Sequence, residues 1–299
     1  MKSQNPISII IFTSLVLFSC SNTTENKTVP GAPEKHSVIR FYFAPSLTKP
    51  LLNDKADELI HFLGKETNLH IEPVIPRDHE TMIHDFGSGK AHIGMMNTLS
   101  FIAAVNKYDV NARLKSVKYG ETSYRGQIIA NADKNVNTIE DIAGKRFAFT
   151  NRNSTSGYLY PAKILKAKGV KPGEILYGKE HDSVVEMVYN GTADAGATYY
   201  SEPGPNGQIR DARALLLHKY PDIQEKVKII DLTEPIPNDP LVFSNELPED
   251  LVSQICQAMI KFSKTAEGKK LLTALYGTEG FVKCTNEDYQ AMFEAIEKE

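Results

Sequence analysis

Apolar and polar positions follow two different periods along the chain after residue 36. Stretches dominated by β-branched and aromatic residues predict strands, and stretches with apolar residues three or four positions apart predict helices. The first strand is predicted over residues 37–44 and the first helix over 52–67. The pattern then predicts a strand, a helix, a strand and a helix, over residues 69–74, 79–87, 91–96 and 99–106. This order is typical of an α/β sheet with mainly parallel strands.

A second alternating region begins near Gly126. Its predicted strands cover 127–130, 146–149, 193–198 and 227–231, and its predicted helices cover 137–142, 156–168 and 184–190. An extended segment at 241–243 and helices over 248–262, 268–276 and 286–297 follow. Because about 260 residues exceed what one hydrophobic core usually holds, two α/β units are expected, at about 36–125 and 126–232. Two such lobes would bind a ligand in the crevice between them, whereas one larger domain would bind it at the carboxyl ends of its strands.

The N-terminal segment has a different character from the rest. Residues 9–18 form an apolar run that is too short to span a bilayer, which takes about 20 residues, but suits a secretion signal. The run ends at Cys20 in a sequence that resembles a bacterial lipobox, whose cysteine carries lipid such as palmitate. We therefore expect a signal peptide at 1–19, a flexible tether at 20–35, and an extracytoplasmic protein anchored to the bacterial membrane, in the periplasm or at the cell surface. The alternative is an ordinary signal peptide with a chance cysteine.

The net charge of the chain limits the kinds of partner that it can bind. Removal of residues 1–19 takes away one Lys and no acid, which leaves 33 basic and 37 acidic residues and a net charge of −4. A general basic field for nucleic acid or an anionic membrane is therefore absent, and any anion must be bound at a local site.

Cys256 and Cys284 could form a disulfide in an oxidising compartment or lie as two separately buried thiols, and the sequence leaves both open.

Three consecutive hydroxyl residues, Ser154, Thr155 and Ser156, stand between the strand at 146–149 and the helix that follows. The first-turn N–H groups of a helix lack internal partners, and the helix dipole adds partial positive charge there. Together with the hydroxyls they can hold a tetrahedral oxyanion without any Lys or Arg. Simple N-capping is the alternative. A nucleophilic serine is disfavoured, because the sequence has no Gly-x-Ser-x-Gly motif and pairs no base with these hydroxyls.

Four stretches of the sequence together resemble a known family. They are Ser-Tyr-Arg at 123–125, Asn-Ser-Thr-Ser-Gly-Tyr at 153–158 with Pro161, His-Asp at 181–182 ahead of 190–197, and Pro-Ile-Pro-Asn-Asp-Pro at 235–240. From about residue 37 to 265 the chain resembles the phosphate/phosphite/phosphonate-binding family of ABC-importer solute-binding proteins. The resemblance implies an α/β, two-lobed type II periplasmic-binding-protein fold with a ligand cleft between the lobes. Lobe one would be 36–125 plus 236–299, and lobe two would be 126–235.

The resemblance also implies a set of ligand-binding residues: Ser154, Thr155, Ser156, Tyr124, His181, Glu202, Asp239 and His79. The three hydroxyls would donate to the ligand's oxygens, with Tyr124 and His181 nearby. In aminoalkylphosphonate binders of this family two acids receive the ligand's ammonium, and their places fall on Glu202 and Asp239. Such a pair suits a cationic tail and would repel a bare phosphate dianion, so aminoalkylphosphonate is the expected ligand.

Four of the other five residues also have a structural interpretation. Tyr124 could be a core aromatic residue, His181 a surface histidine and Glu202 a solvated acid, and Asp239 could stabilise a turn.

The sequence departs from the family pattern in lobe one. His79 stands where many aminophosphonate binders carry tyrosine, and residues 95–98 contain neither an aromatic residue nor a glycine. A histidine there could favour a more anionic ligand or make its affinity depend on pH. His79 and His84 also lie in an Asp- and His-rich stretch with His92, but their spacing of five does not place them on one helix face, so no metal site is expected.

These features lead to one expected function and two alternatives. The expected function is capture of phosphonate, phosphate or phosphite by a monomeric protein without a cofactor or catalytic residue, which delivers it to an ABC permease and ATPase. A ligand-sensing adapter lipoprotein for a membrane signalling partner is the first alternative. A periplasmic hydrolase that uses a serine of 154–156 is the second, and the absence of an evident general base argues against it.

Overall fold

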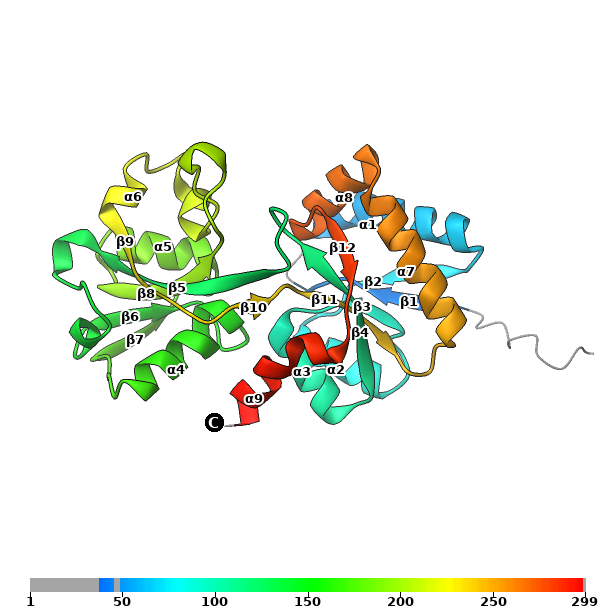
Figure 1. Ribbon diagram of the computed structural model, residues 1–299, viewed down its shortest axis with the longest axis horizontal. Coiled ribbons are helices and arrows are strands. Elements are labelled where there is room, and N and C mark those ends of the chain that lie inside the picture. The colour runs from blue at the N-terminus through cyan, green and yellow to red at the C-terminus, as the bar shows by residue number, and fades with distance from the viewer. Residues whose placement is uncertain (1–37, 46–48, 298–299) are drawn as a thin grey trace, which may run out of the picture. The chain divides into compact units, whose positions relative to one another are not determined.

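Two mixed β-sheets with helices on their faces make up the fold (Figure 1). The computed structural model describes residues 38–45 and 49–297, all of them within one unit of the chain, Ser37–Glu299. The predicted signal peptide, Cys20 and the tether lie outside the described residues. In the described part of the chain, no helix combines the length and the apolar character that a membrane span requires.

Sheet one has the strand order β12-β4-β11-β3-β1-β2. Its strands are β1 (Ile39–Tyr42), β2 (Ile71–Val74), β3 (Ile93–Met95), β4 (Val110–Val117), β11 (Pro240–Ser244) and β12 (Gly280–Lys283). The helices beside it are α1 (Lys49–Thr67), α2 (His79–Gly87), α3 (Thr98–Lys107), α7 (Glu249–Ser263), α8 (Ala266–Tyr276) and α9 (Gln290–Glu297), the last preceded by the 3₁₀ turn η6 (Asn286–Tyr289).

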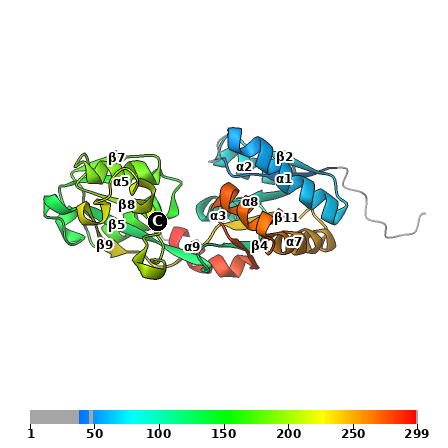
Figure 2. The same ribbon diagram turned by 90° about the horizontal axis from the view of Figure 1, so that it is seen from above.

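The two faces of sheet one bury different sets of helices, because successive strand residues point to opposite sides. Phe41 and Phe243 pack in one core with α1, α7 and α8, while Tyr42 and Val242 pack in another with α2, α3 and α9. In Figure 1 the first group lies above the strands and the second below them, and Figure 2 shows the same elements from above. Sheet one is thus covered on both faces.

Sheet two has the order β10-β5-β8-β6-β7, and β9 also pairs with β5. Its strands are β5 (Ser123–Asn131), β6 (Arg146–Phe149), β7 (Glu174–Tyr177), β8 (Ala195–Tyr200), β9 (Val227–Leu232) and β10 (Ile236–Pro237). Its helices are α4 (Tyr160–Ala167), directly preceded by the π-helical turn η3 (Thr155–Leu159), α5 (His181–Tyr189) and α6 (Ile223–Lys226). The 3₁₀ turns are η1 (Ala132–Lys134), η2 (Glu140–Ile142), η4 (Pro205–Gly207) and η5 (Ala212–Leu216).

Two neighbouring segments carry the chain between the sheets. The first is the turn from β4 to β5, in which the backbone groups of Lys118 and Glu121 exchange two hydrogen bonds of 2.9 Å. The second runs from β9 through β10 to β11, and the side-chain amide of Asn238 in it donates to the carbonyls of Ser116 and Glu121 at 3.0 and 2.9 Å. These bonds tie the two segments together.

The structure corrects the predicted strand directions and leaves the fold class unchanged. The pairs β1–β2, β1–β3, β6–β7 and β6–β8 are parallel, whereas β4, β5, β9, β10, β11 and β12 pair antiparallel to their neighbours. The prediction of mainly parallel strands was wrong. The strands that flank the two connecting segments, such as β4, β5 and β11, are antiparallel to the strands beside them.

Cys256 and Cys284 are separate buried thiols. They belong to the cores on opposite faces of sheet one, and burial raises the pKa of both thiols to about 12. The structure thus agrees with the second of the two possibilities that the sequence left open.

Candidate ligand-binding site

A cavity of about 930 Å³ is lined by residues of both sheets and of the two connecting segments. Its walls include His79, Met96, Asn97 and Tyr276 from around sheet one, and Ser154, Thr155, Ser156, His181 and Tyr199 from around sheet two. Lys118, Tyr119, Tyr124, Asn238 and Asp239 come from the connecting segments and their borders. Seven of the eight predicted ligand-binding residues therefore meet at one cavity, and Glu202 is not among its lining residues.

The helix after β6 begins with a π-helical turn where the sequence predicted regular α-helix. The N–H of Leu159 donates to the carbonyl of Ser154 at 3.0 Å, a five-residue step that widens the first turn. A side chain at Gly157 would come within 2.2 Å of the Thr150 hydroxyl, so the close packing of this turn against the loop needs glycine. Turns of this kind are frequent at functional sites.

The three hydroxyl residues of this turn line the cavity, and one of them also caps the helix. Ser154 Oγ accepts the N–H of Gly157 at 3.0 Å, which is the N-capping interaction, while its O–H remains available to donate. Thr155 and Ser156 are 4% and 2% exposed, so a ligand that reached them would be almost fully removed from water. Ser156 also hydrogen-bonds the phenol of Tyr124, whose pKa burial raises so that it stays neutral. This part of the cavity therefore offers uncharged donors.

Two histidines lie on opposite sides of the cavity with a buried nitrogen free. His181, the first residue of α5, packs edge-on against Tyr199 with ring centroids 5.0 Å apart, and burial lowers its pKa from 6.5 to about 4. His79, the first residue of α2, lies 3.3 Å from the Asn97 side-chain nitrogen through Nε2, and burial lowers its pKa too. Within the described residues, the Nδ1 atoms of both rings and the hydroxyl of Tyr276 are buried without a hydrogen-bond partner. Because buried polar atoms normally have partners, these atoms suit a polar ligand.

Asp239 is the acid that the structure places deepest in the cavity wall. Its carbonyl accepts the N–H of Ser116 at 3.1 Å, and its carboxylate accepts the N–H of Thr98. Burial raises the pKa of the Asp239 carboxyl, and the nearby charge of Lys118 acts in the opposite direction. Lys118 also lines the cavity, so this carboxylate shares the cavity with a lysine.

The second predicted acid, Glu202, lies elsewhere. It is exposed, and its carboxylate accepts the hydroxyl of Tyr200 at 3.1 Å. The same segment instead contributes Arg210 to the cavity wall, with its guanidinium 4.4 Å above the ring of Tyr119. The structure therefore does not assemble the Glu202–Asp239 pair, and the role of Glu202 stays a prediction.

Sequence reasoning missed Lys118, Arg210, Tyr199 and Tyr276 as cavity residues. A signal existed for Lys118, which directly precedes a Tyr-Gly turn close to the Ser-Tyr-Arg motif. The others come from segments with no such marker, and only tertiary structure brings them to the cavity.

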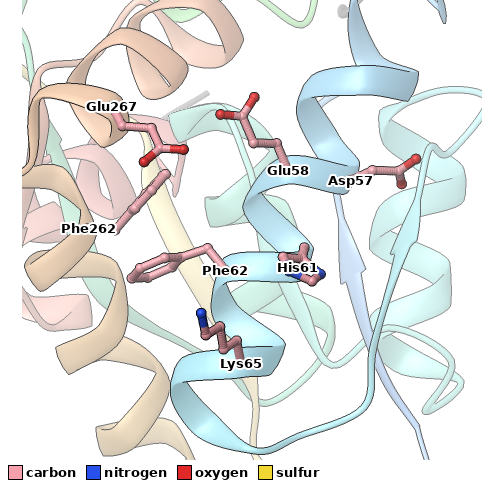
Figure 3. Close-up of a pocket in the computed structure, with 7 residues that line it drawn as sticks. All are labelled: Asp57, Glu58, His61, Phe62, Lys65, Phe262 and Glu267. Atoms are coloured by element: carbon pink, nitrogen blue, oxygen red, sulfur yellow. The ribbon is translucent and has the colours of Figure 1, made fainter.

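A second hollow, shown in Figure 3, lies where α1 meets α7 and α8 and has a volume of about 560 Å³. Its floor is the pair Phe62 and Phe262, with ring centroids 4.3 Å apart, and its rim carries Asp57, Glu58 and Glu267. None of the unpartnered buried polar atoms found in the described part of the chain lies in it. The acidic rim makes it unsuitable for an anion.

The chain has the fold of the type II periplasmic binding proteins. PhnD1 from Prochlorococcus marinus, solved in complex with methylphosphonate, superposes with a TM-score of 0.67 at 18% identity, over 88% of this chain and 98% of that chain. A binding-protein component of a phosphonate ABC transporter from Pseudomonas aeruginosa gives 0.67 at 20% identity, over 86% and 85%. These similarities show the fold.

The chain belongs to the family described as ABC transporter, phosphonate, periplasmic substrate-binding protein, whose profile matches residues 41–289. The Phosphate-import protein PhnD of Mycolicibacterium smegmatis is 28% identical over 202 residues, 62% of either protein's length. The Phosphonates-binding periplasmic protein of Escherichia coli is 22% identical over 276 residues, 89% of this chain and 78% of the relative. The family consists of substrate-binding transport components, which are not enzymes.

Proposed function

We propose that this chain captures a phosphorus oxyanion, a phosphonate or phosphate, outside the cytoplasm and delivers it to an ABC permease and its ATPase. Family membership supports the transport role. In this proposal the lobes are residues 36–125 plus 236–299 and residues 126–235, and they close on the ligand by a hinge at the two connecting segments. The protein acts as a monomer.

The placement of the η3 turn is the observation that carries the proposal. Thr155 and Ser156 are almost fully buried, yet both line the cavity. First-turn N–H groups and hydroxyls at this position suit the oxygens of a phosphoryl group. Hydrogen bonds to a charged group contribute about 1.5–3 kcal/mol each, so a few of them give high affinity without a fixed cation.

The other residues of the site have complementary roles in this proposal. His181 and Tyr124 flank the hydroxyls, and the free Nδ1 atoms of His181 and His79 give the ligand partners on two sides of the cavity. A neutral imidazole can donate one hydrogen bond, and the bound anion would favour that tautomer. Closure would bring these donors around the phosphoryl group.

Calorimetric titration tests the proposal directly. The purified chain from residue 37 onward should bind at least one of phosphate, phosphite, methylphosphonate and 2-aminoethylphosphonate with a Kd of about 1 μM or tighter, which corresponds to about 8 kcal/mol. Sulfate serves as a control of similar shape. Absence of binding to all four phosphorus compounds would remove the proposal.

We also propose that lipid on Cys20 holds the mature protein at the membrane. The apolar run that ends at this cysteine and the polar segment that follows it support this. Metabolic labelling with a palmitate analogue should mark the wild-type protein and leave Cys20→Ala unmarked. Labelling of both proteins, or of neither, would contradict the anchor.

A further inference from the structure

We propose that Lys118 sets ligand selectivity by placing a positive charge in the same cavity as Asp239, so that the chain prefers phosphate or alkylphosphonate to a phosphonate that carries an amine. The inference rests on the proposed function and concerns the part of the ligand beyond the phosphoryl group. It follows from three observations: the fixed position of Lys118, the environment of Asp239, and the location of the remaining acids.

The backbone at Lys118 is held firmly in place. Lys118 and Tyr119 open a tight turn in which Tyr119 and Gly120 both have positive φ, 54° and 79°. The N–H of Gly120 donates to the Glu279 carboxylate at 3.1 Å, and the Asn238 side chain bonds the carbonyl of Glu121 at 2.9 Å. The lysine side chain therefore starts from a defined point on the cavity wall.

Asp239 lies beside this turn. The hydrogen bond from the Ser116 N–H to the Asp239 carbonyl, 3.1 Å, places Asp239 next to the end of β4, two residues before Lys118. Both side chains line the cavity, and the positive charge of Lys118 acts on the Asp239 carboxylate. A ligand ammonium at Asp239 would therefore lie near a like charge.

The other acids of the described cavity wall are paired or exposed. Asp78 is engaged by Arg77 at 2.8 Å and by the N–H of Thr81 at 2.7 Å. Glu80 and Glu180 are exposed, and water weakens the attraction of an exposed charge. Glu202 lies outside the wall, while Lys118, Arg210 and Lys179 add positive charge to it. A ligand ammonium would therefore be repelled by these cations, and Asp239 is the one lining acid in the described wall that is neither exposed nor paired with a basic side chain.

Calorimetry on the wild type and on Lys118→Met tests whether Lys118 causes the preference for a ligand without an amine. The wild type should bind methylphosphonate at least about 10-fold more tightly than 2-aminoethylphosphonate, the discrimination expected for a tail ammonium that meets a like charge. In Lys118→Met that ratio should fall by about 10-fold or more, because the ammonium would reach Asp239 without a like charge nearby. Lys269→Met is the control: it removes an exposed lysine that is not among the cavity residues, and it should leave the ratio unchanged.

Each outcome has a defined meaning. Tight wild-type binding of 2-aminoethylphosphonate, at or above the affinity for methylphosphonate, overturns the inference and leaves the proposed function standing. An unchanged ratio in Lys118→Met overturns it as well. If Lys118→Met does not fold, Lys118→Gln replaces it under the same criterion. Failure of the wild type to bind any phosphorus compound refutes the proposed function instead.

Discussion

The two walls of the cavity differ in the kind of group that they present. One wall, which we call the hydroxyl wall, consists of Ser154, Thr155, Ser156 and Tyr124 with His181, and all of these side chains are neutral. The other, the charged wall, consists of Lys118 and Asp239 with His79 beside them. The three hydroxyl residues of the hydroxyl wall lie at the start of one helix, flanked by Tyr124 of β5 and His181 of α5, and Lys118 and Asp239 of the charged wall lie on the two connecting segments.

We infer from this difference that the hydroxyl wall determines the affinity for the phosphoryl group and the charged wall determines the selectivity for the ligand's tail. A neutral donor set binds a phosphoryl group without a fixed counter-charge, so the ligand can be released when the lobes open. A carboxylate and an ammonium in one wall contribute little net charge, but each of them attracts or repels a charged ligand tail. Substitutions in each wall test these separate roles.

Loss of the hydroxyl wall should cause the largest loss of affinity. Ser154→Ala combined with Thr155→Ala removes two donors to a charged ligand, and affinity for methylphosphonate should fall by at least about 100-fold. Thr265→Ala is the matched control. Thr265 caps α8 by accepting the N–H of Gly268 at 2.9 Å, much as Ser154 caps η3 at 3.0 Å, but it lies outside the cavity.

Both of these cap deletions should cost about 1 kcal/mol of stability, and only the double variant should lose binding in calorimetry. Equal affinity in the double variant and the control would show that the hydroxyls are caps and nothing more.

The neutrality of the hydroxyl wall should appear in the pH dependence of stability. Burial lowers the pKa of His181 from 6.5 to about 4. The unfolded chain therefore binds a proton that the folded chain does not, between these two pH values, and stability falls as the pH drops through them. Between pH 7 and pH 4.5 the wild type should lose on the order of 2 kcal/mol more than His181→Gln, measured by urea unfolding. Parallel losses in the two proteins would show that His181 is not held neutral.

The charged wall can be tested by removing its acid. Asp239→Asn keeps the side chain's size and an acceptor for the Thr98 N–H, and it removes the negative charge that faces an anionic ligand. Affinity for phosphate should rise by about 5-fold, equivalent to about 1 kcal/mol of relieved repulsion. Calorimetry measures the change, and Asp182→Asn, which is not a cavity residue, is the control. A fall in phosphate affinity would mean that Asp239 supports the site rather than opposing the anion.

Removal of Glu202 should have the smallest effect. Its carboxylate is exposed and hydrogen-bonded to Tyr200, so Glu202→Gln should change the affinity for 2-aminoethylphosphonate by no more than about 2-fold. A competition titration against methylphosphonate resolves a change of this size. A loss of about 10-fold or more would mean that closure carries Glu202 to the ligand, as the family resemblance implies.

Strong periodic patterns in the sequence predicted most of the fold. α2 and β6 have the predicted bounds, because a hydrophobic period with a clear start and stop defines each of them. The strands β4, β7, β10 and β12 were not predicted. β4 has the alternating burial that its sequence could have indicated, whereas β7 is an edge strand with Ile175 and Tyr177 exposed and so lacks that alternation.

The candidate site was predictable where its residues are consecutive in sequence. Ser154, Thr155 and Ser156 act together on one helix start, so their motif is visible, although the π-helical form of the turn is not. Arg210 was not predictable, because it reaches the cavity from a segment whose position depends on contacts distant in sequence, such as the packing of its guanidinium on Tyr119. The Tyr-Gly turn after Lys118 was visible, but the Asn238 bonds that hold this segment at the cavity were not. Glu202 could be aligned with the family pattern, but alignment does not fix where an exposed side chain lies.

A crystal structure of the chain with methylphosphonate tests the central claim most directly. The account predicts phosphonate oxygens within about 3 Å of the Ser154, Thr155 and Ser156 hydroxyls or of the amides at the start of η3. It also predicts the methyl group on the side of Lys118 and Asp239. A phosphonate held instead by Lys118, Lys179 or Arg210, with the hydroxyls turned away from it, would contradict the account.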